Sequence, residues 1–318
     1  MSQLSVFIAG ATGVLGRRLV SQFAERGHTV VGLSRDERGD EIVEANGGEP
    51  HRADLFDEQS VVRAAEGSDV VIHAATAVPT ENPTPEKWDV HHRVWTEGVE
   101  ALTKAAAEAG ADQYLQQSIV WVARQPDGES FDEESRVIPD PSTEAAIEAE
   151  EITREADSTY DFDVGILRCG YFYAPDAYHT RSVGEGLLQG EQSIIDGSEN
   201  AKISRLHAHD AASAFVAVGE SGRSGLWHVV DDEPVSPATF FTELADRLDA
   251  PTPGRMSDEE ARQELGDVQV ELFTRPMETS AEKLRSEVGW EPTYATYREG
   301  LDHVVETWRS EGYLLEAS

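Results

Sequence analysis

The chain has 318 residues, enough to bury a substantial core, and carries 61 acidic against 26 basic residues for a net charge of −35. So few basic residues argue against a nucleic-acid-binding protein, and no segment reaches the ~20 apolar residues that span a membrane. The single cysteine, Cys169, excludes an internal disulfide. Because the acidic residues are spread along the chain and no cleavable leader precedes the first apolar segment, we expect a cytoplasmic protein adapted to high salt.

The first predicted elements form a βαβ unit over residues 4–35. An apolar strand (6–9) leads into the glycine turn GATGVLG (10–16), a helix to about Arg26 and a second apolar strand (29–33). A glycine pattern framed by strand, helix and strand is a strong indication of a dinucleotide site.

Each glycine of this turn has a physical reason. Gly10 permits the tight turn, Gly13 permits close approach of a pyrophosphate, and Gly16 lets the helix pack on the strand. The start of the helix offers free N–H groups and the positive end of its dipole to that pyrophosphate. The predicted phosphate-binding set is Gly10, Thr12, Gly13, Val14, Leu15 and Gly16.

The second strand ends at Ser34 and Arg35. An acidic side chain here would bond the adenosine ribose and repel a 2′-phosphate, whereas a hydroxyl and a guanidinium suit that phosphate. An exposed Arg at a strand end is also common, and Asp36 follows at once. We therefore predict NADP as the favoured cofactor and NAD as the alternative.

Strands and helices continue to alternate as far as Cys169, which predicts a doubly wound parallel sheet. The predicted elements are a strand within 47–57, a helix (57–66), a buried strand (68–76), a Pro-rich loop (78–85), a long helix (87–110), a strand (114–122), a helix (142–157) and a strand (162–169).

From Gly170 the pattern loosens into a loop (171–180) and shorter elements. We predict a Rossmann-like α/β fold with a smaller C-terminal substrate lobe, and a site in the crevice between them. The dinucleotide-binding domain would comprise 1–169 plus about 202–230, and the substrate lobe 170–201 plus about 231–318. The later elements are helices at 183–188, from 211, at 237–248, 258–265, 280–288 and 297–309, and a strand at 226–230.

Motifs along nearly the whole chain match one known pattern. Besides the glycine turn, they are ADL (53–55), DVVIHAA (69–75), RCGYFYAP (168–175), LHAHDAA (206–212) and LRSEVGWEP (284–292). Together they resemble the extended short-chain dehydrogenase/reductases, a branch of NAD(P)-dependent sugar epimerases, dehydratases and reductases. The resemblance implies that an adenine-contacting segment, the strand under the cofactor and a residue near the nicotinamide complete the cofactor set: Asp54, Leu55, Ala74, Ala75, Thr76 and Arg168.

The acid/base chemistry of that family rests on Asn, Ser, Tyr and Lys, and its Tyr–Lys pair is missing here. In the family the Tyr exchanges a proton with the substrate, and the Lys ammonium lowers its pKa. The family's spacing after Pro141 places the pair on Ser142 and Ala146, or one residue later on Thr143 and Ile147. Neither register supplies a phenol or an ammonium.

Ser118 is the candidate for the catalytic Ser, and Trp95 stands where the resemblance would place the Asn. A register one residue different would put Ile119 at the Ser position, on the opposite side of the strand. Another group could move the proton, and we take Tyr173 as the candidate. The other candidates in the same loop are Tyr171, Tyr178 and His179, and all of these aromatic side chains could instead pack the crevice.

The resemblance implies hydride transfer on a small polar or sugar-nucleotide substrate, here with a non-standard acid/base. The alternative is a non-catalytic NADP(H)-binding sensor. We expect no metal site, because the histidines lack ligand spacing, and we expect Asp210 to cap a helix. A homodimer could form through the two long helices that begin near Lys87 and Ser142.

Overall fold

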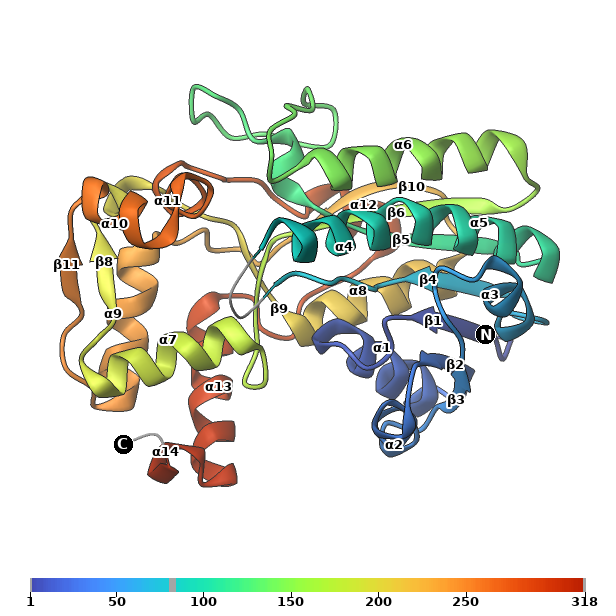
Figure 1. The fold of residues 1–318 in the computed structure, drawn as a ribbon, viewed down its shortest axis with the longest axis horizontal. Helices are drawn as coiled ribbons and strands as arrows, with labels where there is room; N and C mark the ends of the chain where they lie inside the picture. Colours follow the sequence, from blue (N-terminus) through green and yellow to red (C-terminus); the bar gives the residue numbers. More distant parts are fainter. Residues whose placement is uncertain (1, 80–83, 317–318) are drawn as a thin grey trace.

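The protein is built on one parallel sheet of seven strands (Figure 1). The computed structural model describes residues 2–79 and 84–316, so part of the Pro-rich loop predicted over 78–85 lies outside the described residues. The strand order is β10-β6-β5-β4-β1-β2-β3, which confirms the predicted doubly wound α/β fold. The strands are β1 (Ser5–Ala9), β2 (Thr29–Ser34), β3 (Glu49–Arg52), β4 (Val70–His73), β5 (Gln113–Ile119), β6 (Asp163–Cys169) and β10 (Gly225–Val229).

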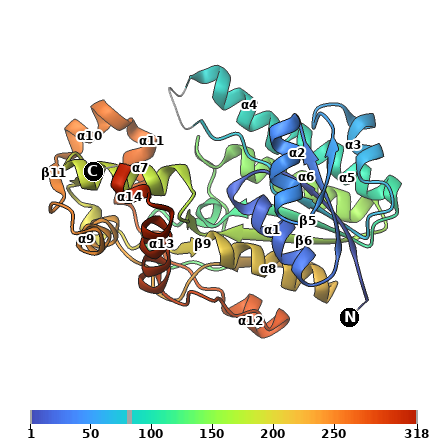
Figure 2. The same cartoon turned by 90° about the horizontal axis from the view of Figure 1, so that it is seen from below.

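Helices cover both faces of this sheet (Figures 1 and 2). No helix within the described residues is long and apolar enough to cross a lipid bilayer. One face carries α3 (Glu58–Ala64), α4 (Pro85–Trp95), α5 (Glu97–Ala109) and α6 (Glu144–Thr159). The other face carries α1 (Val14–Glu25), α2 (Glu37–Ala45), α8 (Ala208–Ser221) and α12 (Glu282–Val288).

The central strands are apolar because both of their faces are covered. In β1, residues 6–9 are fully buried, and in β4, residues 70–73 are at most 2% exposed. Strands that are buried on both sides read as continuous apolar runs and not as alternating patterns. The strand order reverses between β1 and β4, and nucleotides bind at this kind of switch point in open parallel sheets.

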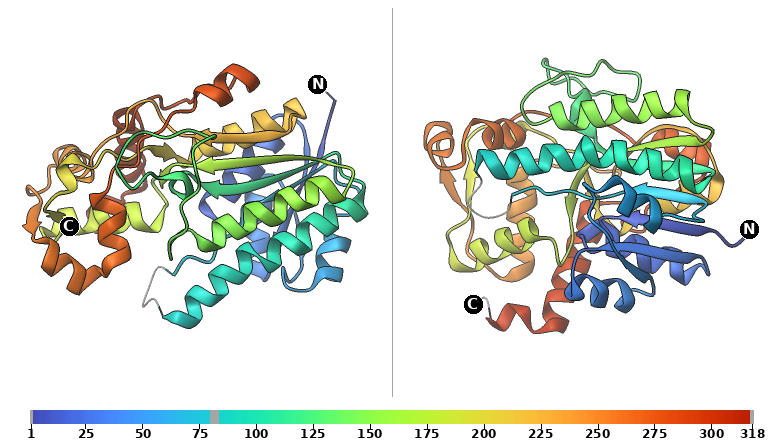
Figure 3. Two further views of the ribbon diagram at one scale, coloured as in Figure 1. Left: turned by 90° about the horizontal axis from the view of Figure 1, so that it is seen from above. Right: turned by 45° about the vertical axis from the view of Figure 1, so that its right-hand side comes forward.

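A smaller lobe lies beyond the carboxyl ends of the strands (Figures 1 and 3). Its core is formed mainly by α7, α9 and α13, and the short β7–β9 pair leads into it from the sheet. The remaining elements are η1 (Val120–Ala123), β7 (Tyr171–Tyr173), α7 (Tyr178–Gln189), β8 (Ser193–Ile195), η2 (Ser198–Asn200), β9 (Arg205–His207), α9 (Pro237–Leu248), β11 (Gly254–Met256), α10 (Asp258–Leu265), α11 (Asp267–Thr274), α13 (Tyr297–Glu311) and α14 (Tyr313–Glu316).

The chain returns to the first core after building most of the second lobe. Leu284 and Trp290 are buried with the residues of the sheet, and the Trp290 indole donates a hydrogen bond to Ser213 on α8 (2.8 Å). The two-domain division drawn from the sequence remains a prediction, and residues 277–290 lie with the first core.

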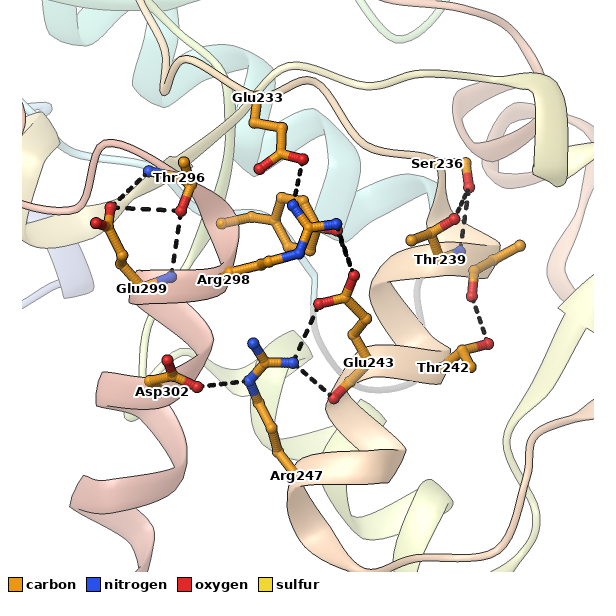
Figure 4. Close-up of polar contacts among 12 residues, drawn as sticks. Glu233, Ser236, Thr239, Thr242, Glu243, Arg247, Thr296, Arg298, Glu299 and Asp302 are labelled. Carbon is orange, nitrogen blue, oxygen red and sulfur yellow. Dashed lines mark hydrogen bonds and ion pairs between the residues drawn. The ribbon is translucent and has the colours of Figure 1, made fainter.

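Ion pairs join α9 to α13 in the second lobe (Figure 4). Glu243 on α9 accepts hydrogen bonds from Tyr297 (2.6 Å) and Arg298 (2.9 Å) on α13. Arg247, one turn further along α9, pairs with Glu243 (3.2 Å) and with Asp302 on α13 (2.7 Å). Several Arg–carboxylate contacts on shared partners form a network, which fixes the helices more firmly than isolated surface pairs would.

Some local predictions were wrong. The helix predicted over 87–110 is interrupted at Thr96, where α4 ends and α5 begins; Thr96 departs from helical dihedrals with φ −103° and ψ −68°, although its amide still donates to the His92 carbonyl (3.0 Å). The predicted loop over 171–180 contains β7 and the start of α7. Asp210 does not cap α8; its carboxylate accepts from the amides of Thr293 (2.7 Å) and Tyr294 (3.0 Å).

Candidate cofactor and substrate site

The glycine turn after β1 packs backbone against backbone. Gly10 has a φ of +86°, and its carbonyl accepts from the Gly13 amide at 3.0 Å. A Cβ at Gly10 would lie 2.5 Å from the Ala75 nitrogen, and a Cβ at Gly16 would lie 1.9 Å from the Gly10 carbonyl oxygen. Only glycine fits at these two positions, because the opposing atoms belong to the backbone and cannot move aside.

Helix α1 begins at Val14, directly after this turn, with Gly13 as its N-cap and no side chain bonded to its first amides. The first intrahelical bond runs from the Arg17 amide to the Gly13 carbonyl, so the N–H groups of the first turn have no acceptor inside the helix. Such a helix start binds anions, and at Gly13 an added Cβ would meet only the Gly10 carbonyl oxygen, at 3.3 Å. These residues therefore fit the phosphates of a dinucleotide.

Two arginines on α1 link this region to the second lobe. Arg17 and Arg18 both pair with Asp176, in the segment after β7, at 2.6 and 2.7 Å. Burial is the largest influence on the pKa of Asp176 and would raise it, but the two guanidinium groups hold it below its ordinary value. The carboxylate therefore stays charged and attached to α1.

The carboxyl end of β2 is where the sequence predicts the adenosine end of the cofactor. Ser34 is buried and donates its hydroxyl to Asp40 (2.5 Å), while the Asp36 carboxylate caps α2 by accepting from the Gly39 amide (2.8 Å). Arg35 is exposed and makes no ion pair or side-chain hydrogen bond with the described part of the chain. Arg35 is thus available to a ligand, whereas the Ser34 hydroxyl is already used.

The other predicted cofactor residues lie beside β3 and β4. Asp54 is exposed, and its carboxylate accepts from the Phe56 amide (3.0 Å); Leu55 is buried against Gly98 on α5. Ala74 and Ala75 directly face Gly10, as the contacts of the glycine turn require. Thr76 follows them on the same segment, so the structure places the segment 74–76 next to the phosphate-binding turn.

Ser118 and Arg168 point away from the carboxyl edge and into the interior, toward α6. Both bind Glu150: Ser118 donates at 2.6 Å, and Arg168 donates from Nε and Nη2 at 2.7 Å each. Burial would raise the pKa of Glu150, but the Arg168 and Ser118 hydrogen bonds and the positive charges of Arg168 and Arg154 hold it below its ordinary value. All three side chains are at most 1% exposed, so the places of Ser118 and Arg168 do not support their predicted roles in catalysis and cofactor binding.

The positions expected for the Tyr–Lys pair hold small side chains. Ser142 bonds Asp140 through its hydroxyl (2.5 Å), and Ala146 is buried in the first turns of α6. In the alternative register, Thr143 is buried and accepts from the Asp140 amide (2.9 Å), and Ile147 packs against the first core. Neither register brings a titrating side chain to this place.

An aromatic cluster follows the carboxyl ends of β5 and β6. Tyr171 contacts Trp121, His179 and Phe273, with ring centroids between 5.4 and 6.4 Å apart. His179 bonds the Phe172 carbonyl through Nε2, so that nitrogen carries the proton. Burial raises the pKa of Tyr171 and lowers that of His179, which keeps both neutral near neutral pH.

Tyr173 lies deeper, in the core of the second lobe. Its ring contacts His207 and Phe240, and its hydroxyl packs so closely on α13 that a Cβ at Gly300 would lie 2.0 Å from it. The side chain is 1% exposed and the hydroxyl has no partner within the described chain. Burial raises the pKa of Tyr173 well above its ordinary value. This environment does not support the predicted acid/base role of Tyr173.

Comparison with known proteins agrees with this geometry. The model of the NAD dependent epimerase/dehydratase family matches residues 6–229, which include the glycine turn and β1 through β10. The chain belongs to this family. A 3-diazoavenalumate denitrifying reductase from a Streptomyces species is 32% identical over 94% of this chain and 99% of its own length.

Solved structures share the fold of this family member at lower identity. UDP-glucose 4-epimerase from Thermus thermophilus, in complex with NAD, superposes with a TM-score of 0.78 at 22% identity and covers 96% of this chain and 99% of its own. DesIV, a dTDP-glucose 4,6-dehydratase from Streptomyces venezuelae with NAD and TYD bound, gives 0.79 at 20% identity and covers 99% and 100%.

Two buried charged residues were not anticipated from the sequence. Glu150 falls in the buried stripe of α6 with Ala146, Ala149 and Thr153, a helical spacing that marks it as inward-facing. Arg205 is the second, a basic residue in the short apolar segment before His207. A charge at an apolar position of a regular pattern is the signal that could have identified both.

We expect Gly13→Ala to weaken NADPH binding at least about tenfold while the protein still folds, because a Cβ there lies 3.3 Å from the Gly10 carbonyl oxygen and reaches into the phosphate space. Calorimetric titration measures the affinity and thermal unfolding measures the stability. Gly186→Ala, on α7 with ordinary contacts of 3.5 Å and more, is the control and should bind normally. Unchanged binding in Gly13→Ala would contradict a phosphate site at this turn.

We expect Glu150→Met to lower the free energy of unfolding by about 3–5 kcal/mol, because Arg168 is left charged and buried, and Glu150→Met with Arg168→Met to recover most of the loss. Glu148→Gln, whose side chain is 51% exposed, should cost less than about 0.5 kcal/mol. Urea unfolding measures all three variants.

The depressed pKa of Glu150 sets the pH dependence of this effect. The stabilisation is fully present above the carboxyl's unfolded pKa of about 4.3 and is lost as pH falls through the lower folded value. The difference between wild type and Glu150→Met should therefore shrink below about pH 4. If Glu150→Met with Arg168→Met were as unstable as Glu150→Met alone, the unpaired charge of Arg168 would not be the cause of the lost stability.

Proposed function

We propose that this protein is an NADPH-dependent reductase that transfers hydride to a small conjugated acceptor without a phenolic acid/base. When bound, the nicotinamide would supply the hydride, and residues at the carboxyl ends of β4, β5 and β6 would hold it. The observation that carries the proposal is that neither register after Pro141 supplies the family's Tyr–Lys pair, while the hydroxyl of Tyr173, the candidate replacement, is buried against α13.

The missing acid/base favours reduction over epimerisation. Epimerases and dehydratases begin by oxidising an alcohol, which requires a base to remove the hydroxyl proton. Neither candidate register on α6 supplies one, and Ser118 is bonded to Glu150. Reduction of an electron-poor acceptor needs hydride first, and the stabilised anion that forms can take its proton from water. The chain then has only to bind and orient the acceptor.

The comparison with known proteins also favours a reductase. One relative that matches over nearly its whole length is a reductase, and its name identifies a diazo compound as its substrate. A diazo group is an acceptor that needs no protonation before hydride arrives. A flat conjugated substrate also suits the aromatic side chains of Trp121, Tyr171 and Phe273, which could stack on it.

We further propose NADP(H) as the cofactor. Arg35 is unpaired within the described chain and exposed at the end of β2, where the 2′-phosphate of NADP lies in sheets of this type. Asp36 is occupied as the cap of α2 and Ser34 as a donor to Asp40. A guanidinium without a competing carboxylate partner favours the phosphorylated ribose.

The reaction is tested by following loss of reduced nicotinamide with NADPH and a panel of α,β-unsaturated, diazo and carbonyl compounds, beside UDP-glucose and dTDP-glucose. We expect oxidation of NADPH with the activated acceptors, no change in either sugar nucleotide, and most of the activity retained in Tyr173→Phe. Epimerisation or dehydration of a sugar nucleotide would overturn the proposal. Tight NADPH binding without turnover of any acceptor would overturn it in favour of a sensor.

The cofactor assignment is tested with Arg35→Ala. We expect NADPH to bind about tenfold more weakly and NADH to bind almost unchanged, because the variant removes a charge-assisted bond to the 2′-phosphate alone. Arg63→Ala, an exposed residue on α3, controls for the change in net charge. Equal affinity of the wild-type protein for NADH and NADPH would contradict the assignment.

A further inference from the structure

Arg205 is a fully buried arginine between the two lobes. It lies on β9, where it pairs in register with Tyr171 of β7, and its side chain is 2% exposed. Its guanidinium lies over the ring of Phe240, 3.8 Å from the centroid, and 5.4 Å from that of Tyr171. The aromatic rings therefore fix the plane of the guanidinium beside the aromatic cluster.

The Nε and Nη2 atoms of Arg205 are buried and have no hydrogen-bond partner within the described chain. They form one edge of the guanidinium, the edge that holds a carboxylate with two parallel bonds. Arg168 uses the same two atoms in this protein to hold Glu150 at 2.7 Å each. Buried polar groups are nearly always bonded, so an unsatisfied edge of this shape points to a missing acceptor.

Asp231 lies near Arg205 and does not supply that acceptor. Its amide donates to the Arg205 carbonyl (2.9 Å), but its carboxyl makes no ion pair with Arg205, and Oδ2 is buried without a partner. Burial is the main reason that the pKa of Asp231 is raised well above its ordinary value. Within the described chain, Arg205 is thus a buried guanidinium without an ion-pair partner.

We propose that Arg205 binds a carboxylate of the substrate through Nε and Nη2, so that the protein acts on planar conjugated carboxylates. The rings of Tyr171 and Phe240 keep the guanidinium edge oriented, and the conjugated part of the substrate lies along the aromatic cluster toward the carboxyl ends of β5 and β6. The direction in which the substrate extends from Arg205 rests on the proposed reductase function. The carboxylate site itself is a binding property that can be measured without turnover.

The experiment compares trans-cinnamate with trans-cinnamamide, two ligands of the same shape of which only the first is charged. Calorimetric titration, with and without NADP, is carried out on wild type, Arg205→Met and Arg205→Lys. We expect wild type to bind cinnamate at least about tenfold more tightly than the amide, Arg205→Met to lose that preference, and Arg205→Lys to keep part of it, because the ammonium lacks the two-pronged edge.

Arg298→Met is the matched control. Arg298 also lies over a tyrosine ring in the second lobe, 4.6 Å from the centroid of Tyr297, but it is partly exposed and paired with Glu243. This variant should keep the full preference for cinnamate. An equal loss in Arg298→Met would show a general charge effect and overturn the proposal.

Thermal unfolding separates binding from a structural role. Without ligand, Arg205→Met should be as stable as wild type or more so, because it removes a buried charge that has no ion-pair partner, and cinnamate should raise the unfolding temperature of wild type but not of Arg205→Met. Should the variant fail to fold, the proposal is contradicted, since that outcome means that Arg205 supports the fold; the comparison of the two ligands on wild type remains a separate test. Equal affinity of wild type for cinnamate and cinnamamide also overturns the proposed carboxylate site.

The outcomes distinguish this inference from the reductase proposal. Cinnamate binding that depends on Arg205, without hydride transfer to any acceptor, would support the carboxylate site and refute the reductase. Hydride transfer to neutral acceptors, with no preference for carboxylates and no effect of Arg205→Met, would support the reductase and refute the carboxylate site.

Discussion

The close approach of three backbone segments near the amino end is the constraint on which the rest of this molecule depends. The turn at Gly10 touches the chain after β4 and the first turn of α1 with no side chain between them. This contact sets the distance between β1, β4 and α1, and so determines where the amides of α1 point. The proposed phosphate site is therefore made by the same packing that holds the sheet and its first helix together.

The roles of Gly10 and Gly16 in the packing could be predicted, because the spacing of glycines in the sequence indicates where the backbone turns tightly or packs closely. The order of strands and helices was also accessible, since apolar runs that alternate with amphipathic segments leave few topologies. Side-chain direction near the site was less accessible. A shift of one residue in β5 reverses the side that Ser118 faces, and its partner Glu150 lies 32 positions away on another element.

The second lobe was the hardest part to anticipate for a related reason. Its helices α9 and α13 are joined by ion pairs and aromatic contacts between residues more than 50 positions apart, such as Glu243 with Tyr297 and Arg298. Such contacts leave no periodic signal in the sequence. The strongly acidic composition adds to the difficulty, because Glu150 has the same residue type as the many solvated glutamates and differs from them only in its place on α6.

The return of the chain to the sheet near its carboxyl end affects how the molecule can assemble and move. Because Leu284 and Trp290 complete the hydrophobic interior around α8, that interior closes only when segments far apart in the sequence come together, and folding depends on these non-local contacts. The lobes are also connected by several crossings of the chain, at β7, β9 and the segments on either side of α12. Any displacement of one lobe against the other therefore has to bend all of these crossing segments together.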